Sequence, residues 1–198
     1  MDARLVAWAR RVKARRGAVA PPPLWLFTDP LAHPDLPATV ARLPRGLCGV
    51  VFRHDAVTDR DALARAVARI CRVRRLTLSV AGDWRLAAAL RAGCHLRDGF
   101  RPRHAPRWAR LATASAHDRT DALRAMRAGV ALILVSPAFP TASHPNAPAL
   151  GVLGWLRVTS GLGGRAAALG GMSGTTARRL PHGKVAAVGA ISALSRMG

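Results

Sequence analysis

Two stretches of this chain combine small residues, prolines and hydroxyl side chains in a way that suits a phosphate group. Residues 136–151 read SPAFPTASHPNAPALG and follow a short apolar run, and residues 168–172 read ALGGM and end another. Small residues let backbone N–H groups approach the oxygens of an anion, and hydroxyl groups can add further donors. The two stretches therefore predict contacts to a phosphorylated ligand, with Gly170 and Gly171 as the leading candidates.

Charged and titratable side chains follow several other apolar runs. Arg53 comes directly after such a run, where a charge is expected to face a ligand rather than bulk solvent. His117 and His144 are candidates for proton transfer because histidine titrates near neutral pH. The alternative for His117 is a structural role, in which its ring forms hydrogen bonds only with the backbone. The alternative for His144 is a solvated residue in a loop. Asp83 and Asp98 are the candidate metal ligands, although Asp83 also suits a helix cap.

The elements that must position these residues alternate regularly along the chain. Helical spacing of apolar residues predicts helices at 59–72, 83–90 and 118–128. Strands that alternate with helices form a parallel sheet, and eight strands close into a barrel. We predict a (β/α)8 TIM barrel rather than an open doubly wound sheet, since no G-x-G-x-x-G motif follows an early strand. The predicted strands are 24–28, 49–52, 76–80, 94–96, 111–115, 131–135, 166–169 and 185–188.

The two ends of the chain depart from the regular pattern. Residues 1–16 read as a basic amphipathic helix, which we expect to cover one end of the barrel rather than to serve as a membrane or targeting segment. Residues 1–20 are then a helical extension, and residues 21–198 are the barrel. Only 191–197 remain for the last helix, which must be short. The apolar face of the first helix consists of Leu5, Trp8, Ala9 and Val12.

Barrel geometry selects the candidate site residues. Ligands bind at the carboxyl ends of the strands, and phosphate groups commonly bind after the seventh and eighth strands. The candidates that follow strands two to eight are, in order, Arg53, Asp83, Asp98, Ser115, His117, Thr141, Ser143, His144, Gly170, Gly171, Val188 and Gly189.

The composition narrows the functional classes. The formal net charge is +21, but all except two of the 31 basic residues are Arg and all ten acidic residues are Asp, which indicates a compositional bias. Such a surface attracts polyanions. No nucleic-acid motif is present, so nucleic-acid binding is the last hypothesis. No apolar run approaches the ~20 residues of a membrane span. Three cysteines in apolar contexts predict reduced core thiols in a cytoplasmic protein.

Six short segments stand at the ends of predicted strands in a characteristic order. Each is weak alone, but together they resemble the thiamine phosphate synthase/TenI superfamily from residue 24 to about residue 193. The segments are GVVFR (49–53), AGCHL (92–96), TASAH (113–117), SPAFPTAS (136–143), ALGGM (168–172) and AVGAIS (187–192).

The resemblance implies a transferase that joins hydroxymethylpyrimidine diphosphate to thiazole (carboxylate) phosphate and releases pyrophosphate, with Mg2+ as cofactor. Charge stabilisation by cations and oriented N–H donors would dominate catalysis. By motif, Arg53 would hold the diphosphate and Ser115 would contact the pyrimidine. The partners would be these phosphorylated small molecules, and a second subunit is one way to cover the side of the short last helix. The implied contacts to the thiazole phosphate are Thr141, Ser143, Gly170, Gly171, Val188 and Gly189.

This chain departs from the family pattern where the metal would bind. The two metal-binding carboxylates of the family align with Ala81-Gly82 and with Phe100. Asp83 and Asp98 are the nearest acids, so a Mg2+ ion, which requires oxygen ligands, would depend on them. The lysine that holds the diphosphate in the family aligns with His144.

The TenI branch implies a second hypothesis, a thiazole tautomerase that works by acid–base proton transfer without a metal. The catalytic histidine of that branch aligns with Pro137, so His117 or His144 would take its role. A third hypothesis is a non-catalytic homologue that binds thiazole phosphate or thiamine phosphate.

Overall fold

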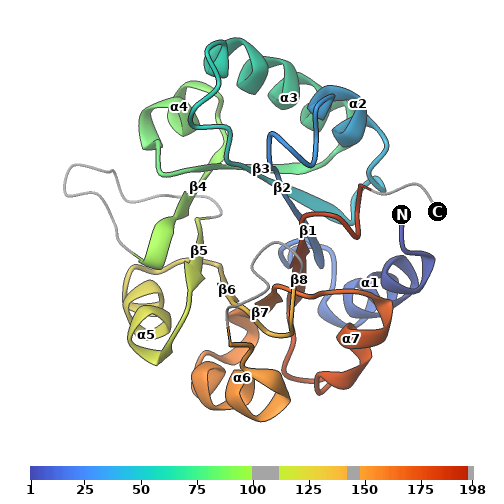
Figure 1. Ribbon diagram of the computed structural model, residues 1–198, viewed down its shortest axis with the longest axis vertical. Helices are drawn as coiled ribbons and strands as arrows, with labels where there is room; N and C mark the ends of the chain where they lie inside the picture. The colour runs from blue at the N-terminus through green and yellow to red at the C-terminus, as the bar shows by residue number, and fades with distance from the viewer. Residues whose placement is uncertain (100–111, 142–147, 196–198) are drawn as a thin grey trace.

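The eight strands are all parallel and form a closed barrel in chain order (Figure 1). The computed structural model describes residues 1–99, 112–141 and 148–195. The first and last strands pair and close the ring, with Leu24 opposite Val188 and Leu26 opposite Ala190. The predicted (β/α)8 barrel is confirmed. The strands are β1 (Leu24–Phe27), β2 (Cys48–Phe52), β3 (Thr77–Ala81), β4 (Gly93–Leu96), β5 (Thr113–Ala116), β6 (Leu132–Val135), β7 (Ala166–Leu169) and β8 (Ala187–Ala190).

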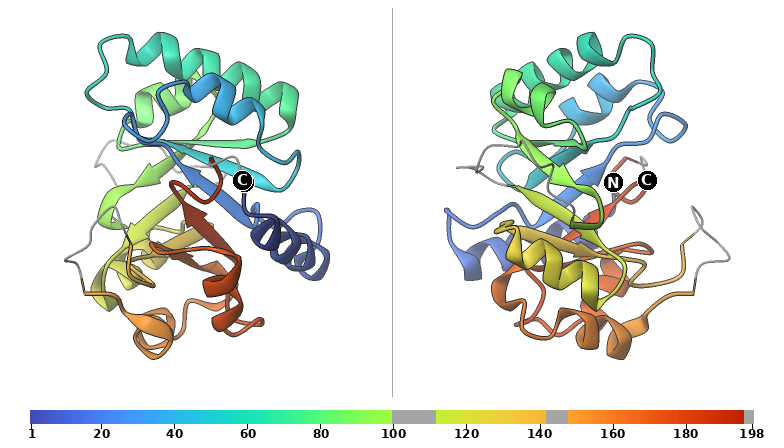
Figure 2. Two further views of the ribbon diagram at one scale, coloured as in Figure 1. Left: turned by 45° about the vertical axis from the view of Figure 1, so that its right-hand side comes forward. Right: turned by 90° about the vertical axis from the view of Figure 1, so that its left-hand side faces the viewer.

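Helices surround the ring of strands on its outside (Figures 1 and 2). The three helices with clear apolar periodicity, α3, α4 and α5, form where the sequence predicts them. Helices α2, α6 and α7 are not among the predicted helices; α2 and α7 have six residues each, and α6 follows the proline-rich stretch. The helices are α1 (Ala3–Arg16), α2 (Leu36–Ala41), α3 (Arg60–Arg74), α4 (Trp84–Ala89), α5 (Arg119–Arg127), α6 (Gly151–Thr159) and α7 (Gly174–Arg179), with short 3-10 turns η1 (Arg97–Gly99) and η2 (Gly163–Arg165).

Aspartate side chains begin many of these helices. The carboxylate of Asp118 accepts a hydrogen bond from the Asp121 backbone N–H at 2.8 Å, and Asp35 accepts one from Ala38 at 2.9 Å. Such caps satisfy N–H groups that the helix itself leaves unpaired. Asp2 and Asp83 cap α1 and α4 in the same way, so four of the ten aspartates serve as helix caps.

Helix α1 packs beside α7, and its four predicted core residues are all buried. The Asp2 carboxylate also accepts a hydrogen bond of 2.6 Å from the Gly174 backbone N–H at the start of α7. The Asp2 N–H donates to the Ala193 carbonyl oxygen at 3.2 Å, so α1 is tied to the segment after β8. Residues 191–195 form a bend and a turn rather than the short helix predicted there. Because α1 already packs on this side of the barrel, the segment after β8 needs no helix to cover it.

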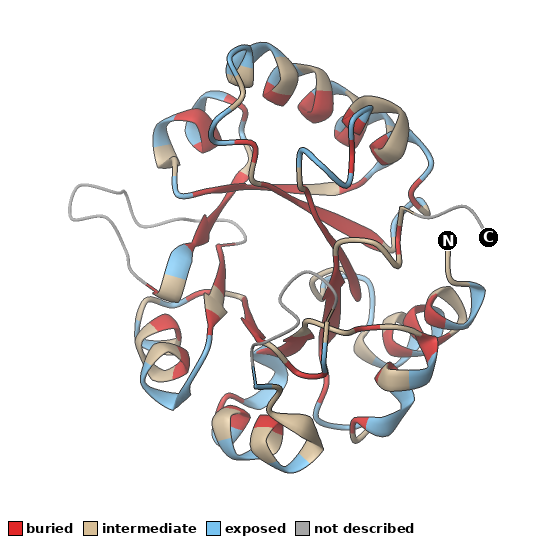
Figure 3. Cartoon of the chain, viewed as in Figure 1, coloured by how far each residue is buried: buried red, intermediate tan, exposed pale blue. Residues whose placement is uncertain are grey.

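Buried apolar residues form two clusters, one inside the barrel and one between the strands and the helices. Figure 3 shows that the strands are almost entirely buried and that the helices are partly buried. His95 on β4 is a polar exception, and its Nδ1 lies 2.9 Å from the Thr113 hydroxyl. His95 is therefore both buried and hydrogen-bonded inside the barrel. In the described part of the chain no helix is long and apolar enough to cross a membrane. The buried free thiols, also as predicted, are Cys48, Cys71 and Cys94.

Candidate functional site

A cavity of 760 Å³ opens at the carboxyl ends of the strands. Its volume is within the range of about 300–1,000 Å³ that is typical of small-molecule sites. Residues at or just after the ends of all eight strands contribute to its wall. The predicted site residues that line it are Arg53, Asp98, Ser115, His117, Thr141, Gly170 and Gly171. Ser143 and His144 lie outside the described residues, so their roles stay predictions.

Arg53 is held rigidly at the end of β2. Its backbone N–H donates to the Thr28 hydroxyl at 2.9 Å, and its side-chain Nε donates to the Thr28 carbonyl at 3.1 Å. The guanidinium lies over the Phe27 ring, 5.6 Å from its centroid, and 3.9 Å from Asp29. Burial lowers the pKa of Arg53, an effect that Asp29 opposes. Even so, the group stays charged at neutral pH, because arginine starts from a pKa above 12. The result is a preorganised cation facing the cavity.

His117 and Asp98 approach each other on the neighbouring wall. His117 Nε2 lies 3.6 Å from Asp98 Oδ1, and His117 Nδ1 lies 3.1 Å from the Ser136 carbonyl oxygen. A carbonyl only accepts hydrogen bonds, so Nδ1 donates to it in the tautomer that carries the proton there, and the Ser136 hydroxyl lies 3.4 Å from the same nitrogen. The contact to Asp98 is then an ion pair only when Nε2 is protonated as well. Asp98 is itself held by Ser115, whose hydroxyl accepts a hydrogen bond of 3.1 Å from the Asp98 backbone N–H. This arrangement can give or take a proton at Nε2.

The glycine pair after β7 is packed tightly against the loop after β6. Both glycines have positive φ, +86° at Gly170 and +62° at Gly171. A Cβ on Gly171 would lie 2.4 Å from the Pro140 carbonyl oxygen, and one on Gly170 would lie 3.0 Å from Pro137. The Phe139 N–H donates to the Gly170 carbonyl at 3.1 Å. Only glycine fits here, so the two loops form one continuous wall of backbone, with Thr141 at its end.

Val188 and Gly189 lie inside β8 and do not line the cavity. The strand ends at Ala190, two residues beyond its predicted end. A Cβ on Gly189 would meet Leu134 and Leu169 at 2.9 Å in the barrel interior. At the end of β8 the residues that line the cavity are Ala190, Ile191, Ser192 and Ala193. They occupy the strand end that the sequence predicts for Val188 and Gly189.

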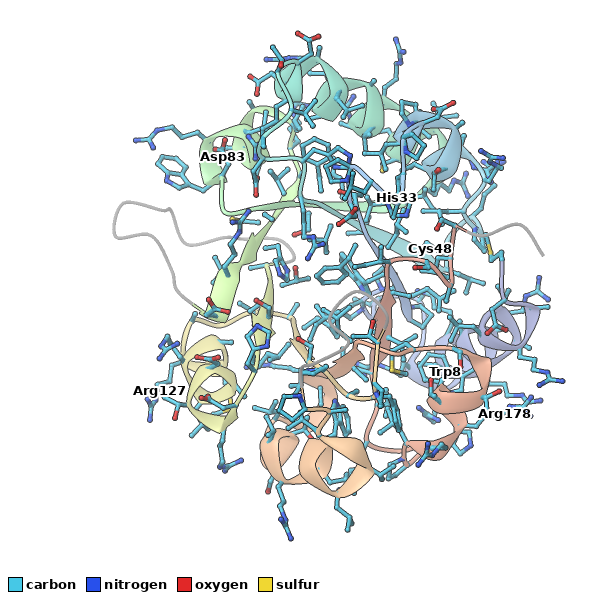
Figure 4. The ribbon with its side chains drawn as sticks, viewed as in Figure 1. Trp8, His33, Cys48, Asp83, Arg127 and Arg178 are labelled. Atoms are coloured by element: carbon cyan, nitrogen blue, oxygen red, sulfur yellow. The ribbon has the colours of Figure 1, made fainter. Side chains whose placement is uncertain are left out.

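Asp83 does not line the cavity either. It begins α4 on the outer side of the strands (Figure 4). Its carboxylate accepts hydrogen bonds of 2.9 Å from both the Leu86 N–H and Arg60 Nη1. Burial acts to raise the pKa of Asp83, but these hydrogen bonds and the charge of Arg60 lower it below the usual value. Of the two roles that the sequence allows for Asp83, the structure shows the helix cap.

The cavity wall also contains charged residues that are not among the predicted site residues. Asp55 forms ion pairs with Arg97 and, at 3.3 Å, with Arg60, and Asp29 stands beside Arg53. Arg97 follows β4 directly, so the strand-end rule selects it together with Asp98, but the sequence assigns it no role. Asp55 and Asp29 lie one or two residues further into their loops, where the sequence offers no signal to separate them from ordinary loop aspartates.

The described residues do not form a site that fits Mg2+. This ion takes oxygen ligands in near-ideal octahedral geometry. The three carboxylates on the cavity wall stand on different loops, and each already faces a cationic or histidine side chain of the protein. Among the described residues no three His, Cys, Asp or Glu side chains are grouped closely enough to hold a metal ion. A metal bound by these carboxylates would compete with Arg53, Arg97 and His117 for them.

Comparison with known proteins places the barrel and its cavity in a family. Residues 26–194 match the family model TMP-TENI, described as thiamine monophosphate synthase. The chain belongs to this family. None of the curated proteins matches the chain. The resemblance inferred from six short segments is thereby confirmed for most of the chain.

Solved structures with the same fold confirm the barrel and vary in their chemistry. Thiamine phosphate pyrophosphorylase from Pyrococcus furiosus is 18% identical, with a TM-score of 0.67, and the match covers 92% of this chain and 90% of that one. A structure described as native KDPGal is 15% identical, with a TM-score of 0.57 and coverage of 89% and 85%. A putative fructose-1,6-biphosphate aldolase from Coccidioides immitis is 14% identical, with a TM-score of 0.54 and coverage of 94% and 80%. At these identities the likeness shows the fold alone.

Proposed function

We propose that this member of the thiamine monophosphate synthase family is a transferase that joins hydroxymethylpyrimidine diphosphate to thiazole (carboxylate) phosphate. The observation that carries the proposal is that one cavity is lined both by a fixed arginine and by a glycine-rich backbone wall, which are two candidate sites for anions. On one side stands the fixed guanidinium of Arg53. On the other stands the backbone wall made by the loops after β6 and β7, with Gly170 and Gly171 at its centre. A single phosphorylated ligand needs only one such side, whereas a condensation of two needs both.

The residues would contribute mainly by positioning and charge. Arg53 would hold the diphosphate and stabilise the negative charge that grows as the bond between the pyrimidine methylene and the diphosphate oxygen breaks. The glycine wall and the N–H groups after β8 would bind the thiazole phosphate, so that the thiazole nitrogen can form the new C–N bond. Preorganised donors of this kind are the largest single contribution in many enzymes. Ser115, which lines the cavity beside Asp98, would contact the pyrimidine.

The test is a mass-spectrometric assay of the purified protein with both phosphorylated substrates, in Mg2+ and in EDTA. We expect thiamine phosphate to form. The Arg53→Ala variant should lose about 10²-fold or more in kcat/KM, as expected when a charged transition-state contact is removed. The matched control is Arg127→Ala, which removes an exposed arginine on α5, away from the cavity (Figure 4). No thiamine phosphate from the wild-type protein under either condition would overturn the proposal.

A specific observation favours a second candidate, a thiazole tautomerase. His117 lines the cavity with Nε2 directed at Asp98, an arrangement suited to acid–base proton transfer and needing no metal. If this is the activity, His117→Ala should lower turnover far more than affinity for the thiazole phosphate, because the histidine acts on the reacting proton. Equal losses in both would mean that His117 only shapes the cavity. If the protein binds thiazole phosphate but catalyses neither the condensation nor the tautomerisation, the hypothesis of a non-catalytic homologue remains.

A further inference from the structure

The side chain of Arg97 lies against Gly82, just after the end of β3. A Cβ on Gly82 would lie 3.4 Å from Arg97 Nε and 3.7 Å from its Cζ. Arg97 follows the end of β4, so its side chain reaches across to the neighbouring strand end. The two distances are ordinary van der Waals distances, so the guanidinium lies in contact with the backbone at the end of β3.

The guanidinium of Arg97 is anchored at one end and available at the other. Its Nη2 pairs with Asp55, a carboxylate that Arg60 holds from its other oxygen at 3.3 Å. The Arg97 side chain is nevertheless 55% exposed, and it lines the cavity. A planar guanidinium has five N–H donors, so the pair with Asp55 leaves others to face the cavity.

Arg53 stands close enough to Arg97 that the two charges act on each other. The charge of Arg97 contributes to lowering the pKa of Arg53, after burial. Among the described residues, the terminal nitrogens of Arg53 have only the 3.9 Å ion pair with Asp29. Two guanidinium groups on one cavity wall repel each other, and an anion with two adjacent charged groups would relieve the repulsion. Guanidinium groups bind phosphate oxygens in a bidentate manner, which adds geometric selectivity.

The same wall does not suit a divalent cation, since its carboxylates are already paired with basic or histidine side chains. We propose that Arg53 and Arg97 bind the diphosphate group of the substrate directly, without Mg2+. The inference deepens the proposed transferase function and rests on it for the identity of the substrate. Its own content is narrower: a metal-independent site for two linked phosphates.

The experiment is calorimetric titration of the purified protein with inorganic pyrophosphate and with inorganic phosphate, each in EDTA and in Mg2+. We expect pyrophosphate to bind in EDTA as tightly as in Mg2+, and more tightly than phosphate. Arg97→Gln should weaken pyrophosphate binding about 10- to 100-fold, the cost of losing hydrogen bonds to a charged group. Arg97→Lys keeps the charge and loses the planar guanidinium, so its affinity for pyrophosphate should lie between those of the wild-type protein and Arg97→Gln. Arg127→Ala removes the same charge from α5 and should change nothing.

Three results would overturn the inference: binding that requires Mg2+, equal affinity for phosphate and pyrophosphate, or unchanged affinity in both Arg97 variants. If pyrophosphate were only attracted to the general positive charge of the +21 chain, Arg127→Ala would weaken its binding as much as the Arg97 variants do. That result would also overturn the inference. The condensation assay is separate. Pyrophosphate binding that depends on Arg97 in a protein that makes no thiamine phosphate would refute the proposed function and leave this site standing.

Discussion

Replacing Gly171 with alanine tests whether the loops after β6 and β7 form one wall. The added methyl group would lie 2.4 Å from the Pro140 carbonyl oxygen and 2.7 Å from that of Phe139, both backbone atoms that no side-chain rotation can move. Overpacking of this kind costs about 1–3 kcal/mol. The backbone at φ +62° adds a left-handed penalty for alanine, which is about 1–2 kcal/mol. Together the two effects predict a loss of about 2–5 kcal/mol in the free energy of unfolding.

The chain offers a matched control for this substitution. Gly129 ends α5 with φ +76°, and a Cβ there would meet nothing within 4 Å. Gly129→Ala therefore carries only the left-handed penalty of about 1–2 kcal/mol. Urea unfolding of both variants measures the difference, provided that the m-values agree. Because the Gly171 wall faces the cavity, Gly171→Ala should also weaken binding of the thiazole phosphate, while Gly129→Ala should not. Equal stability of the two variants would refute the close contact between the loops.

Further predictions concern pH, packing and thiol chemistry. Burial, followed by the charges of Arg53 and Arg97, lowers the pKa of His95 from 6.5 to about 3. The unfolded chain therefore binds the proton first as the pH falls below 6.5, and the free energy of unfolding should drop by about 2 kcal/mol from pH 7 to pH 5. His95→Gln should remove this part of the drop in urea unfolding, and an unchanged pH slope would contradict it. Trp8→Ala should lower the free energy of unfolding by about 3–5 kcal/mol in the same assay, since the indole is 3% exposed. The control Arg11→Ala, at an exposed position of the same helix, should lower it by about 0.5 kcal/mol or less. Burial raises the pKa of the three thiols to about 11 or 12, so iodoacetamide at pH 8 should label them, by mass spectrometry, only after unfolding.

The candidates at the strand ends show how accurately the local sequence pattern predicts site residues. Arg53, Ser115 and Gly170 were predicted because each stands at or just after the end of an apolar strand, and the carboxyl ends of parallel strands meet at one face of a barrel. That reasoning places residues to within one or two positions, which is enough for side chains on loops. This precision is not enough for Val188 and Gly189. The strand ends two residues later than predicted, so both residues lie inside β8 rather than at the cavity.

Asp83 illustrates a different limit. Its position before an apolar helical pattern favours a helix cap over a metal ligand, and the structure shows the cap. The sequence does not predict Arg60, 23 residues away, which pairs with the other carboxylate oxygen. An ion pair with a distant residue leaves no periodic trace in the sequence, so it can be found only once the chain is folded.

The sequence by itself determined the barrel, its family and the face on which the cavity lies, because burial periodicity and strand-end motifs are local properties of the chain. Only the tertiary structure decided how charge is distributed over that face. Arg97 pairs with Asp55, 42 residues earlier, and its guanidinium passes over Gly82 from the neighbouring strand end. Coulomb interactions depend on distances in space, which parallel strands bring to a few ångströms between segments that are far apart in sequence.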